Sequence, residues 1–245
     1  MEKIKTDNQK EEVQETNITR VVYEEALKVY RKKDFPKAAQ LFYELFKRDT
    51  NSSVVCYFGG VSAFRVKEWE IAEKMFLKTT ELKKNYYHDM YARIFLSLIA
   101  IYRSDFETAK KQLEKTIKGD FLNPLPYSFL GYIANKEKRY EEADKMFQKS
   151  MKFDRNNPSF NNNLGFNYLE WNRNIEKAQY HISHALKKDA NNHYYLHSMG
   201  WYFFIKKNFQ MAIDFLKRSL KISHHKRTEE DLKKSLEQQK KMEKK

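Results

Sequence analysis

Residues 127–157 carry a hydrophobic pattern that the rest of the chain repeats. Two runs of apolar residues with helical spacing flank a short polar segment, which is typical of two helices joined by a turn. Small residues, Gly131 and Ala143, stand in the two runs where packed helices would have to approach each other closely. The pattern therefore predicts a helical hairpin.

Three ladders of matching positions extend this hairpin along the chain. Alanine recurs at steps of 34, 37, 34, 35 and 34 residues, at Ala38, Ala72, Ala109, Ala143, Ala178 and Ala212. A second ladder holds small residues at Ala26, Gly60, Ser97, Gly131, Gly165 and Gly200. A large apolar residue stands three positions before each alanine, at Phe35, Trp69, Phe106, Tyr140, Ile175 and Phe209. The ladders agree and predict six repeats, at 19–52, 53–86, 90–123, 124–157, 158–192 and 193–226.

This repeat resembles the tetratricopeptide repeat (TPR). The packing positions of that family are held in one repeat by Tyr127, Leu130, Gly131, Ala134, Ala143 and Phe147, and the resemblance covers about 208 of the 245 residues. It implies an all-α fold, a right-handed superhelical solenoid of six helical hairpins with a C-terminal capping helix. Extra residues at about 87–89 and within 171–174 depart from the family spacing, and we expect both to lengthen loops between helices.

The two ends of the chain differ from the repeats. Residues 1–18 contain three lysines, five acids and few apolar residues, which predicts a disordered tail. Residues 227–245 predict a charged helix that caps the last repeat, with Thr228 and Asp231 at the spacing of a capping box. Leu232 and Leu236 are expected to pack against apolar residues around Phe215 and Leu220.

A partner-binding groove follows from the resemblance, because in the family the first helix of each hairpin lines the concave surface of the solenoid. The large and polar residues expected to face it are Tyr23, Tyr30, Tyr57, Phe64, Tyr91, Ile94, Leu98, Tyr132, Asn135, Asn162, Phe166, Tyr194, His197, Trp201 and Phe204. Such an aromatic, apolar face suits a peptide or an amphipathic helix of another protein. Inter-repeat packing is expected to use about half of these side chains. We therefore predict a non-enzymatic scaffold that binds proteins and helps to assemble a complex; nothing in the sequence indicates a homo-oligomer.

The net charge of +14 leaves an alternative open, a helical-repeat protein that binds RNA or another anionic surface through a basic convex face. Lysine supplies 36 of the 47 basic residues, which is also what an AT-rich coding sequence would produce. Few charged residues fall on the predicted groove. Nucleic acid is therefore the less favoured partner.

The sequence shows no pattern of catalytic or cofactor-binding residues. It has no glycine-rich phosphate loop and no nucleophile next to a base. His181 with His184, and His193 with His197, have helical spacing, but a zinc site would need the two pairs or a carboxylate such as Asp189 to converge, and no metal is predicted. The single Cys56 is expected to be structural. With no signal peptide and no long apolar run, the prediction is a cytoplasmic protein that reaches a membrane only through a partner.

Overall fold

The computed structural model describes residues 19–243, and that part of the chain is helical with no strand. The predicted all-α fold is confirmed. The predicted disordered tail lies outside the described residues. The chain divides into two compact units, residues 1–119 and 120–245, which are described separately below.

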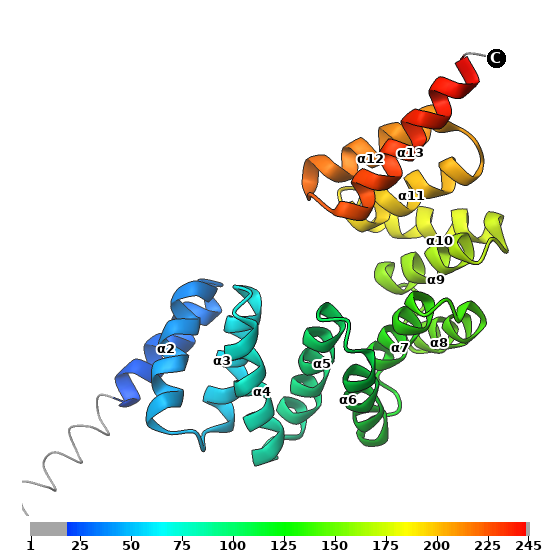
Figure 1. The fold of residues 1–245 in the computed structure, drawn as a ribbon. Coiled ribbons are helices and arrows are strands. Elements are labelled where there is room, and N and C mark those ends of the chain that lie inside the picture. Colours follow the sequence, from blue (N-terminus) through cyan, green and yellow to red (C-terminus); the bar gives the residue numbers. More distant parts are fainter. Residues whose placement is uncertain (1–18, 244–245) are drawn as a thin grey trace, which may run out of the picture. The chain divides into compact units, whose positions relative to one another are not determined.

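Unit 1 consists of three consecutive helical hairpins (Figure 1). Its first helix covers residues 19–31. The helices that follow are α2 (Phe35–Arg48), α3 (Ser53–Arg65), α4 (Trp69–Leu82), α5 (Tyr86–Tyr102) and α6 (Phe106–Gly119).

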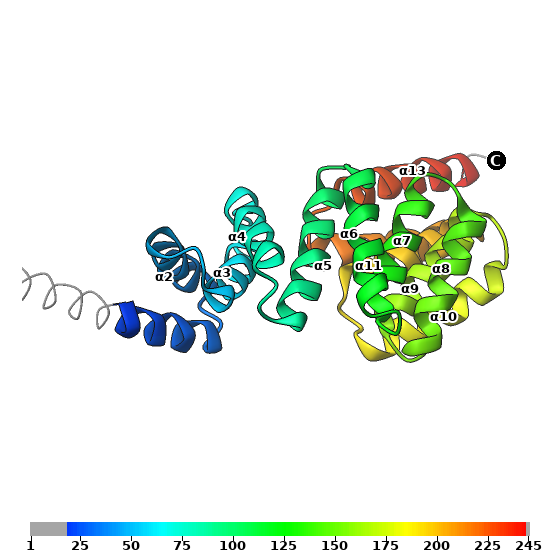
Figure 2. The same ribbon diagram turned by 90° about the horizontal axis from the view of Figure 1, so that it is seen from below.

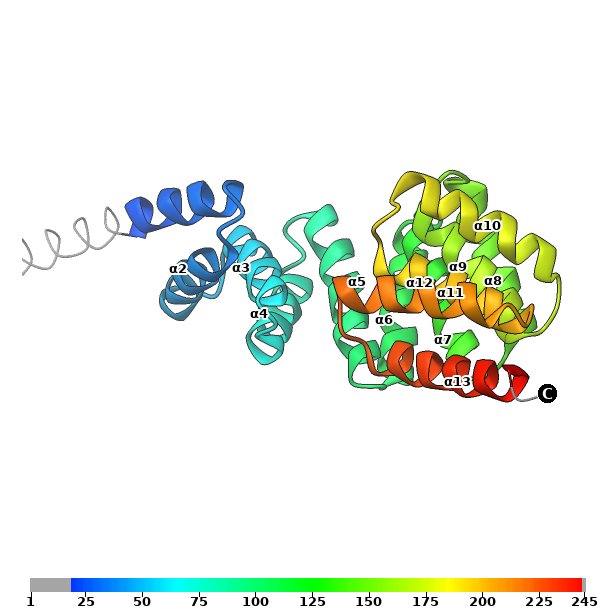
Figure 3. The same cartoon turned by 90° about the horizontal axis from the view of Figure 1, so that it is seen from above.

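Unit 2 consists of three further hairpins and a last helix that packs against α12 and α11 (Figures 2 and 3). Its helices are α7 (Pro124–Lys136), α8 (Tyr140–Phe153), α9 (Pro158–Glu170), α10 (Ile175–Lys188), α11 (His193–Ile205), α12 (Phe209–Ile222) and α13 (Lys226–Glu243). In both units we call the leading helix of each hairpin its first helix and the other its second helix.

Helices begin at the first residue of five of the six expected repeats, and the third repeat is the exception. Its extra residues do not lengthen a loop, as we expected, but add a turn to the start of α5. The Asn85 side chain caps the lengthened helix by accepting a hydrogen bond from the His88 amide, at 3.0 Å. The extra residue of the fifth repeat does lengthen a turn, since residues 171–174 separate α9 from α10 where three residues suffice elsewhere.

Each hairpin turn contains a residue in the left-handed region of backbone conformation. In the six turns these residues are Lys33, Lys67, Ser104, Lys138, Asn172 and Lys207, with a second one at Asn174. The fourth turn shows the associated hydrogen bonds, because the amides of Lys138 and Arg139 donate to Asn135 and Ala134. This is the Schellman end of a helix, where glycine is the usual residue. Here lysine takes its place in four turns of six.

We expect Lys138→Gly to raise the free energy of unfolding by about 0.5–1 kcal/mol. Glycine adopts a positive φ without steric cost, which outweighs the extra freedom it gives the unfolded chain. Urea denaturation followed by circular dichroism measures the change. Asn172→Gly is the matched control, since asparagine already tolerates this conformation, and its effect should be smaller. A destabilised Lys138→Gly variant would contradict the prediction.

Two of the first helices in unit 2 begin with an asparagine cap followed by a proline. Asn123 and Asn157 are N-caps, and each is followed by a proline in the first turn. The Asn123 carboxamide oxygen accepts from the Leu125 amide at 3.0 Å, and Asn157 caps Ser159 in the same way. Proline is tolerated there because the first amides of a helix have no acceptor within it.

The ladder residues form the contact between the two helices of a hairpin. A Cβ atom added to Gly131 would lie 2.7 Å from the ring of Phe147, so the glycine is required by the close approach of α7 and α8. Phe147 is 1% exposed and Ala143 is fully buried. Both belong to a core that continues through Leu164 and Ile182 to Tyr202. Packing residues from all three repeats thus build one continuous interior in this unit.

The last helix, α13, begins two residues before the predicted capping-box threonine. Thr228 is therefore not an N-cap but lies buried in the first turn. The face that α13 turns to the unit holds Thr228, Asp231 and Ser235, whereas Leu236 is 37% exposed. Leu232 is partly buried. The packing of the two leucines against Phe215 and Leu220 stays a prediction, and buried polar side chains do much of the covering.

Candidate functional site

In unit 1, packing takes up much of the predicted groove. Tyr30 lies edge-on to Phe58 at 4.9 Å between ring centroids, and Phe64 lies at the same distance from Phe95. Tyr57 stacks on His88 at 4.3 Å, and burial raises the pKa of Tyr57 to about 12. Ile94 is buried in the interior, so in this structure it is no part of an accessible face. These rings hold neighbouring helices together.

Fewer predicted residues of unit 1 remain accessible. Tyr91 is exposed on α5, whereas Leu98 and Tyr23 are partly buried. Tyr23 packs against the core of the first hairpin. Unit 1 therefore offers scattered accessible positions on its first helices.

In unit 2, the predicted residues fall on successive first helices at matching positions. Tyr132 lies on α7, Phe166 on α9 and Trp201 on α11. Tyr132 is 36% exposed, and the other two rings are partly buried. We call these three rings, with the charged side chains that contact them, the aromatic ladder.

Each ring of the aromatic ladder carries a cation over its face. The Lys136 ammonium lies 5.3 Å from the centroid of Tyr132, the Arg227 guanidinium 4.9 Å from that of Phe166, and the Lys234 ammonium 5.7 Å from that of Trp201. These distances are typical of cation–π pairs. Two of the three cations come from α13, so the last helix contributes directly to the predicted binding face.

A buried carboxylate holds α13 in place. The Asp231 side chain is 2% exposed, and its Oδ2 lies 3.1 Å from Nε2 of His197. Lys234 donates to Oδ1 at 2.9 Å, and Arg227 lies 3.6 Å from Oδ2 while it reaches Glu170 on α9 at 2.9 Å. Burial raises the pKa of Asp231, but the hydrogen bonds and charges of His197 and Lys234 outweigh it and hold the pKa below its usual range. The contact between Asp231 and His197 joins α13 to α11, and the ion pair of Arg227 with Glu170 joins α13 to α9.

At the α7 end of the aromatic ladder, around Tyr132 and Lys136, positive charge exceeds negative charge. Burial, and then the nearby Arg227, lower the pKa of Lys136, and Glu170 only partly offsets them. Burial also raises the pKa of the neighbouring Tyr132. Arg227 is paired with Glu170 and Asp231, whereas Lys136 forms no ion pair with an acid of residues 19–243. Its ammonium beside the partly exposed Tyr132 ring would favour the approach of a carboxylate.

The remaining predicted residues of unit 2 have distinct environments. Asn135 donates to the Asn167 carboxamide oxygen at 2.8 Å and joins α7 to α9. Asn162 is buried, and its Oδ1 has no hydrogen-bond donor among the described residues. Phe204 stacks on Trp201 with centroids 4.7 Å apart. Tyr194 lies apart from the ladder, exposed at the start of α11.

The histidines and the cysteine have structural surroundings. His181 lies within 2.9 Å of the Asn161 carboxamide oxygen, and burial lowers the pKa of this histidine. No group of three His, Cys, Asp or Glu side chains in residues 19–243 is arranged to hold a metal ion. Burial raises the pKa of the Cys56 thiol to about 11, and the thiol donates to the Thr50 carbonyl.

Sequence reasoning missed Arg227, Asp231 and Lys234. The signal was present, because one further step of 34 residues from His197 leads to Asp231. Continuing the ladders beyond the sixth repeat would have placed α13 as a seventh first helix, with Asp231 next to the histidine it binds.

Comparison with known proteins identifies the type of repeat. The family model of the tetratricopeptide repeat protein 21 C-terminal ARM domain matches residues 1–178. No curated protein sequence matches the chain. No helix in the described part of the chain is both long enough and apolar enough to cross a membrane.

Solved structures of similar fold are TPR proteins. A tetratricopeptide repeat protein from Parabacteroides merdae superposes with a TM-score of 0.72 at 11% identity, over 89% of this chain and 84% of that chain. A chain of the APC/C hetero-tetramer Cut9-Hcn1 gives 0.71 at 18% identity, over 83% of this chain. Yeast Tom70 gives 0.60 at 16% identity, over 84% of this chain. This chain spans 40% of the Cut9-Hcn1 chain and 44% of Tom70.

Proposed function

Because the chain belongs to the tetratricopeptide repeat protein 21 C-terminal ARM domain family of helical-repeat proteins, we propose that it is a non-enzymatic scaffold that binds a segment of a partner protein. The binding site proposed is the first-helix face of unit 2, centred on the aromatic ladder. The partner segment combines apolar and acidic side chains. The scaffold function accords with the structures of similar fold, which include the APC/C hetero-tetramer Cut9-Hcn1.

The observation that carries this proposal is the cation over every ring of the ladder. Aromatic side chains are enriched at binding hot spots because they bury a large area with few rotatable bonds. Arg227 and Lys234 are paired with Glu170 and Asp231, so the charge that a purely apolar ligand would leave unmatched is the Lys136 ammonium. An acidic residue beside an apolar one would satisfy both features.

Within the ladder, Tyr132 and Lys136 form the accessible part of the proposed site. Phe166 and Trp201 are contacted by Arg227 and Lys234 of α13, whereas Tyr132 has its cation, Lys136, on its own helix and is the most exposed ring of the three. Two positions four apart on one helix face the same side. A partner segment would therefore place an apolar side chain on Tyr132 and a carboxylate near Lys136.

Peptide selection followed by affinity measurement tests the proposal. A random peptide library is panned on the immobilised full chain, and the enriched peptides are measured by fluorescence anisotropy. The double variant Tyr132→Ala with Lys136→Glu should weaken binding by about 2 kcal/mol or more, which is roughly thirtyfold. Affinity capture from cells with both proteins, followed by mass spectrometry, then identifies natural partners that require the site.

The control carries the same two substitutions on the outer side of the unit. Tyr180→Ala with Lys177→Glu changes an exposed tyrosine and an exposed lysine of α10. Binding should stay within about twofold, because substitutions outside an interface have little effect on affinity. Equal loss in both variants, or no loss in the Tyr132 and Lys136 variant, would place the binding site elsewhere.

A further inference from the structure

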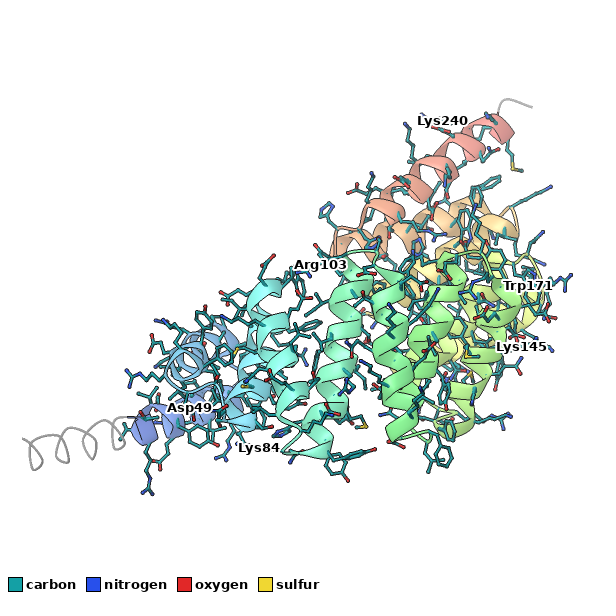
Figure 4. All side chains as sticks on the ribbon, turned by 60° about the horizontal axis from the view of Figure 1, so that its bottom comes forward. Asp49, Lys84, Arg103, Lys145, Trp171 and Lys240 are labelled. Carbon is teal, nitrogen blue, oxygen red and sulfur yellow. The ribbon has the colours of Figure 1, made fainter. Side chains whose placement is uncertain are left out.

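The two ends of the helices in unit 2 differ sharply in charge. Because helices alternate in direction, the turns within hairpins lie at one end and the loops between repeats at the other. Figure 4 shows the same alternation in unit 1, where Asp49 and Lys84 of two such loops lie at one end and Arg103 of a hairpin turn at the other. In unit 2 we call the loop end the basic edge, made of residues 120–123, 149–157, 187–194 and 217–226.

The basic edge carries an excess of unpaired positive charge. Its segments hold nine lysines and arginines and three aspartates, a net charge of 9 − 3 = +6. The basic residues are Lys149, Lys152, Arg155, Lys187, Lys188, Lys217, Arg218, Lys221 and Lys226, and all nine are exposed. None of them forms an ion pair with a described acid.

The acids at this edge close the loops instead of neutralising the lysines. Asp120 accepts from the Leu122 amide at 3.1 Å, and Asp189 accepts from the Asn191 amide at 3.2 Å. Asp154 accepts from the Asn157 side chain at 3.0 Å. Each carboxylate has a structural role at its own loop, which leaves the positive charge of the edge uncompensated.

The opposite end of the same helices is an internal comparison. Residues 136–142, 170–176 and 206–210 hold six basic and five acidic side chains, a net charge of 6 − 5 = +1. Several are paired there, with Arg139 on Glu137 and Glu142, and Lys206 on Glu176 at 3.2 Å. Basic residues are about equally dense at the two ends, nine in 31 residues and six in 19, so the difference in net charge comes from the acids, three at the basic edge and five at the opposite end. Helix dipoles favour lysine at the ends of second helices, but they do not account for Arg155 in a loop or Lys226 at the start of α13.

Large apolar side chains project from the same edge. Phe121 is 66% exposed, Leu122 55%, Phe153 39% and Ile222 49%. Their positions are tied together, because the Tyr127 hydroxyl donates to the Phe121 carbonyl, the Tyr127 ring stacks on Phe153 at 6.0 Å, and Lys149 lies over that ring at 4.3 Å. The edge thus alternates exposed apolar groups with long cationic side chains.

We propose that the basic edge of unit 2 docks on the surface of an anionic phospholipid bilayer. Lysines attract the acidic headgroups, and exposed apolar side chains insert at the boundary with the acyl chains. Lysine stems also accompany such insertion, because their methylene groups lie along apolar surface while the ammonium stays in water. This differs from the sequence expectation, in which a membrane is reached only through a partner.

The aliphatic members of the edge favour lipid over nucleic acid. RNA binding through unpaired bases relies on aromatic rings and guanidinium planes that stack. Leu122 and Ile222 have no such face, and seven of the nine cations are lysines rather than arginines. Insertion into a bilayer, by contrast, gains from any large apolar group.

Vesicle binding of the full chain tests the proposal. Flotation with phosphatidylcholine vesicles that contain about 30% phosphatidylserine, at about 0.1 M salt, gives the partition coefficient. The triple variant Lys187→Gln, Lys188→Gln and Lys221→Gln should lower it by about 100-fold, at about fivefold per lysine. The double variant Leu122→Ser with Ile222→Ser should lower it by about tenfold with the charge unchanged.

The matched control removes the same charge at the opposite end, with Lys138→Gln, Arg173→Gln and Lys207→Gln. This variant should bind vesicles within about threefold of the unchanged protein, allowing for the weaker long-range attraction. Equal loss in both triple variants would mean attraction by net charge alone and would overturn the proposal. So would equal binding to vesicles without phosphatidylserine. Tighter binding to a single-stranded RNA than to vesicles, with the Leu122 and Ile222 variant silent, would make nucleic acid the ligand.

Discussion

Replacing Phe147 by alanine is expected to lower the free energy of unfolding by about 3–5 kcal/mol. The ring is 1% exposed and lies against Gly131 in the contact between α7 and α8. Its removal loses the transfer free energy of a large apolar group and leaves a cavity that neighbouring helices cannot fill without moving. Urea denaturation followed by circular dichroism, with the unit located by hydrogen exchange, measures the effect.

Phe153→Ala on the same helix is the matched control. This phenylalanine is 39% exposed at the end of α8, so its loss should cost less than about 1 kcal/mol. The comparison separates burial from residue type and from helix propensity. Equal destabilisation by the two substitutions would mean that Phe147, which lies against Gly131, is not the packing centre described above.

Asp231→Ala should release α13 from unit 2 at a cost of about 2–3 kcal/mol. The substitution removes the acceptor of His197 and Lys234 and leaves the partly buried Arg227 with Glu170 alone. Amide exchange of residues 226–243 should accelerate strongly, while α7 and α8 keep their protection. Unchanged exchange in α13 would show that apolar contacts alone hold the helix.

The lowered pKa of Asp231 also predicts how the attachment of α13 to unit 2 depends on pH. The pKa of Asp231 is depressed in the folded protein, so its contribution is complete above the ordinary value of 3.8 and is lost as the pH falls through the lower folded value. The protection factors of the α13 amides, which correct for the slower intrinsic exchange in acid, should therefore fall in acid in the unchanged protein, whereas in Asp231→Ala they should already be low at neutral pH. Lys234→Ala is the control, because its ammonium is more than half exposed and its loss should cost at most about 1 kcal/mol.

The helical hairpins could be predicted from the sequence because three independent positions recur in each. Small residues at the crossing of two helices and a large residue at the start of the second helix leave few other arrangements for such a spacing. The start of α5 could not be predicted from the same spacing. Nothing in Tyr86–Asp89 breaks a helix, and Asn85 supplies a cap, so the extra residues extended the helix.

The candidate site was only partly predictable, for a geometric reason. Helical periodicity places a side chain on one face, but whether that face meets solvent or the neighbouring first helix depends on how the helices cross. Ile94 and Asn162 became buried at such crossings, while Tyr91 and Tyr132 stayed accessible. The charged contacts of α13 were missed because the ladders were not followed beyond residue 226.

The outward side of α13, the seventh first helix, is charged, and this decides what can pack against it. In the hairpins, the second helix buries the other flank of the first, as α8 does for α7. On α13 the outward side carries Glu229, Glu230, Lys233 and Glu237, all exposed. Another copy of the chain that stacked there would have to desolvate these charges without partners. The charged outward side of α13 therefore disfavours the stacking of a second copy on it and works against end-to-end growth into a fibre.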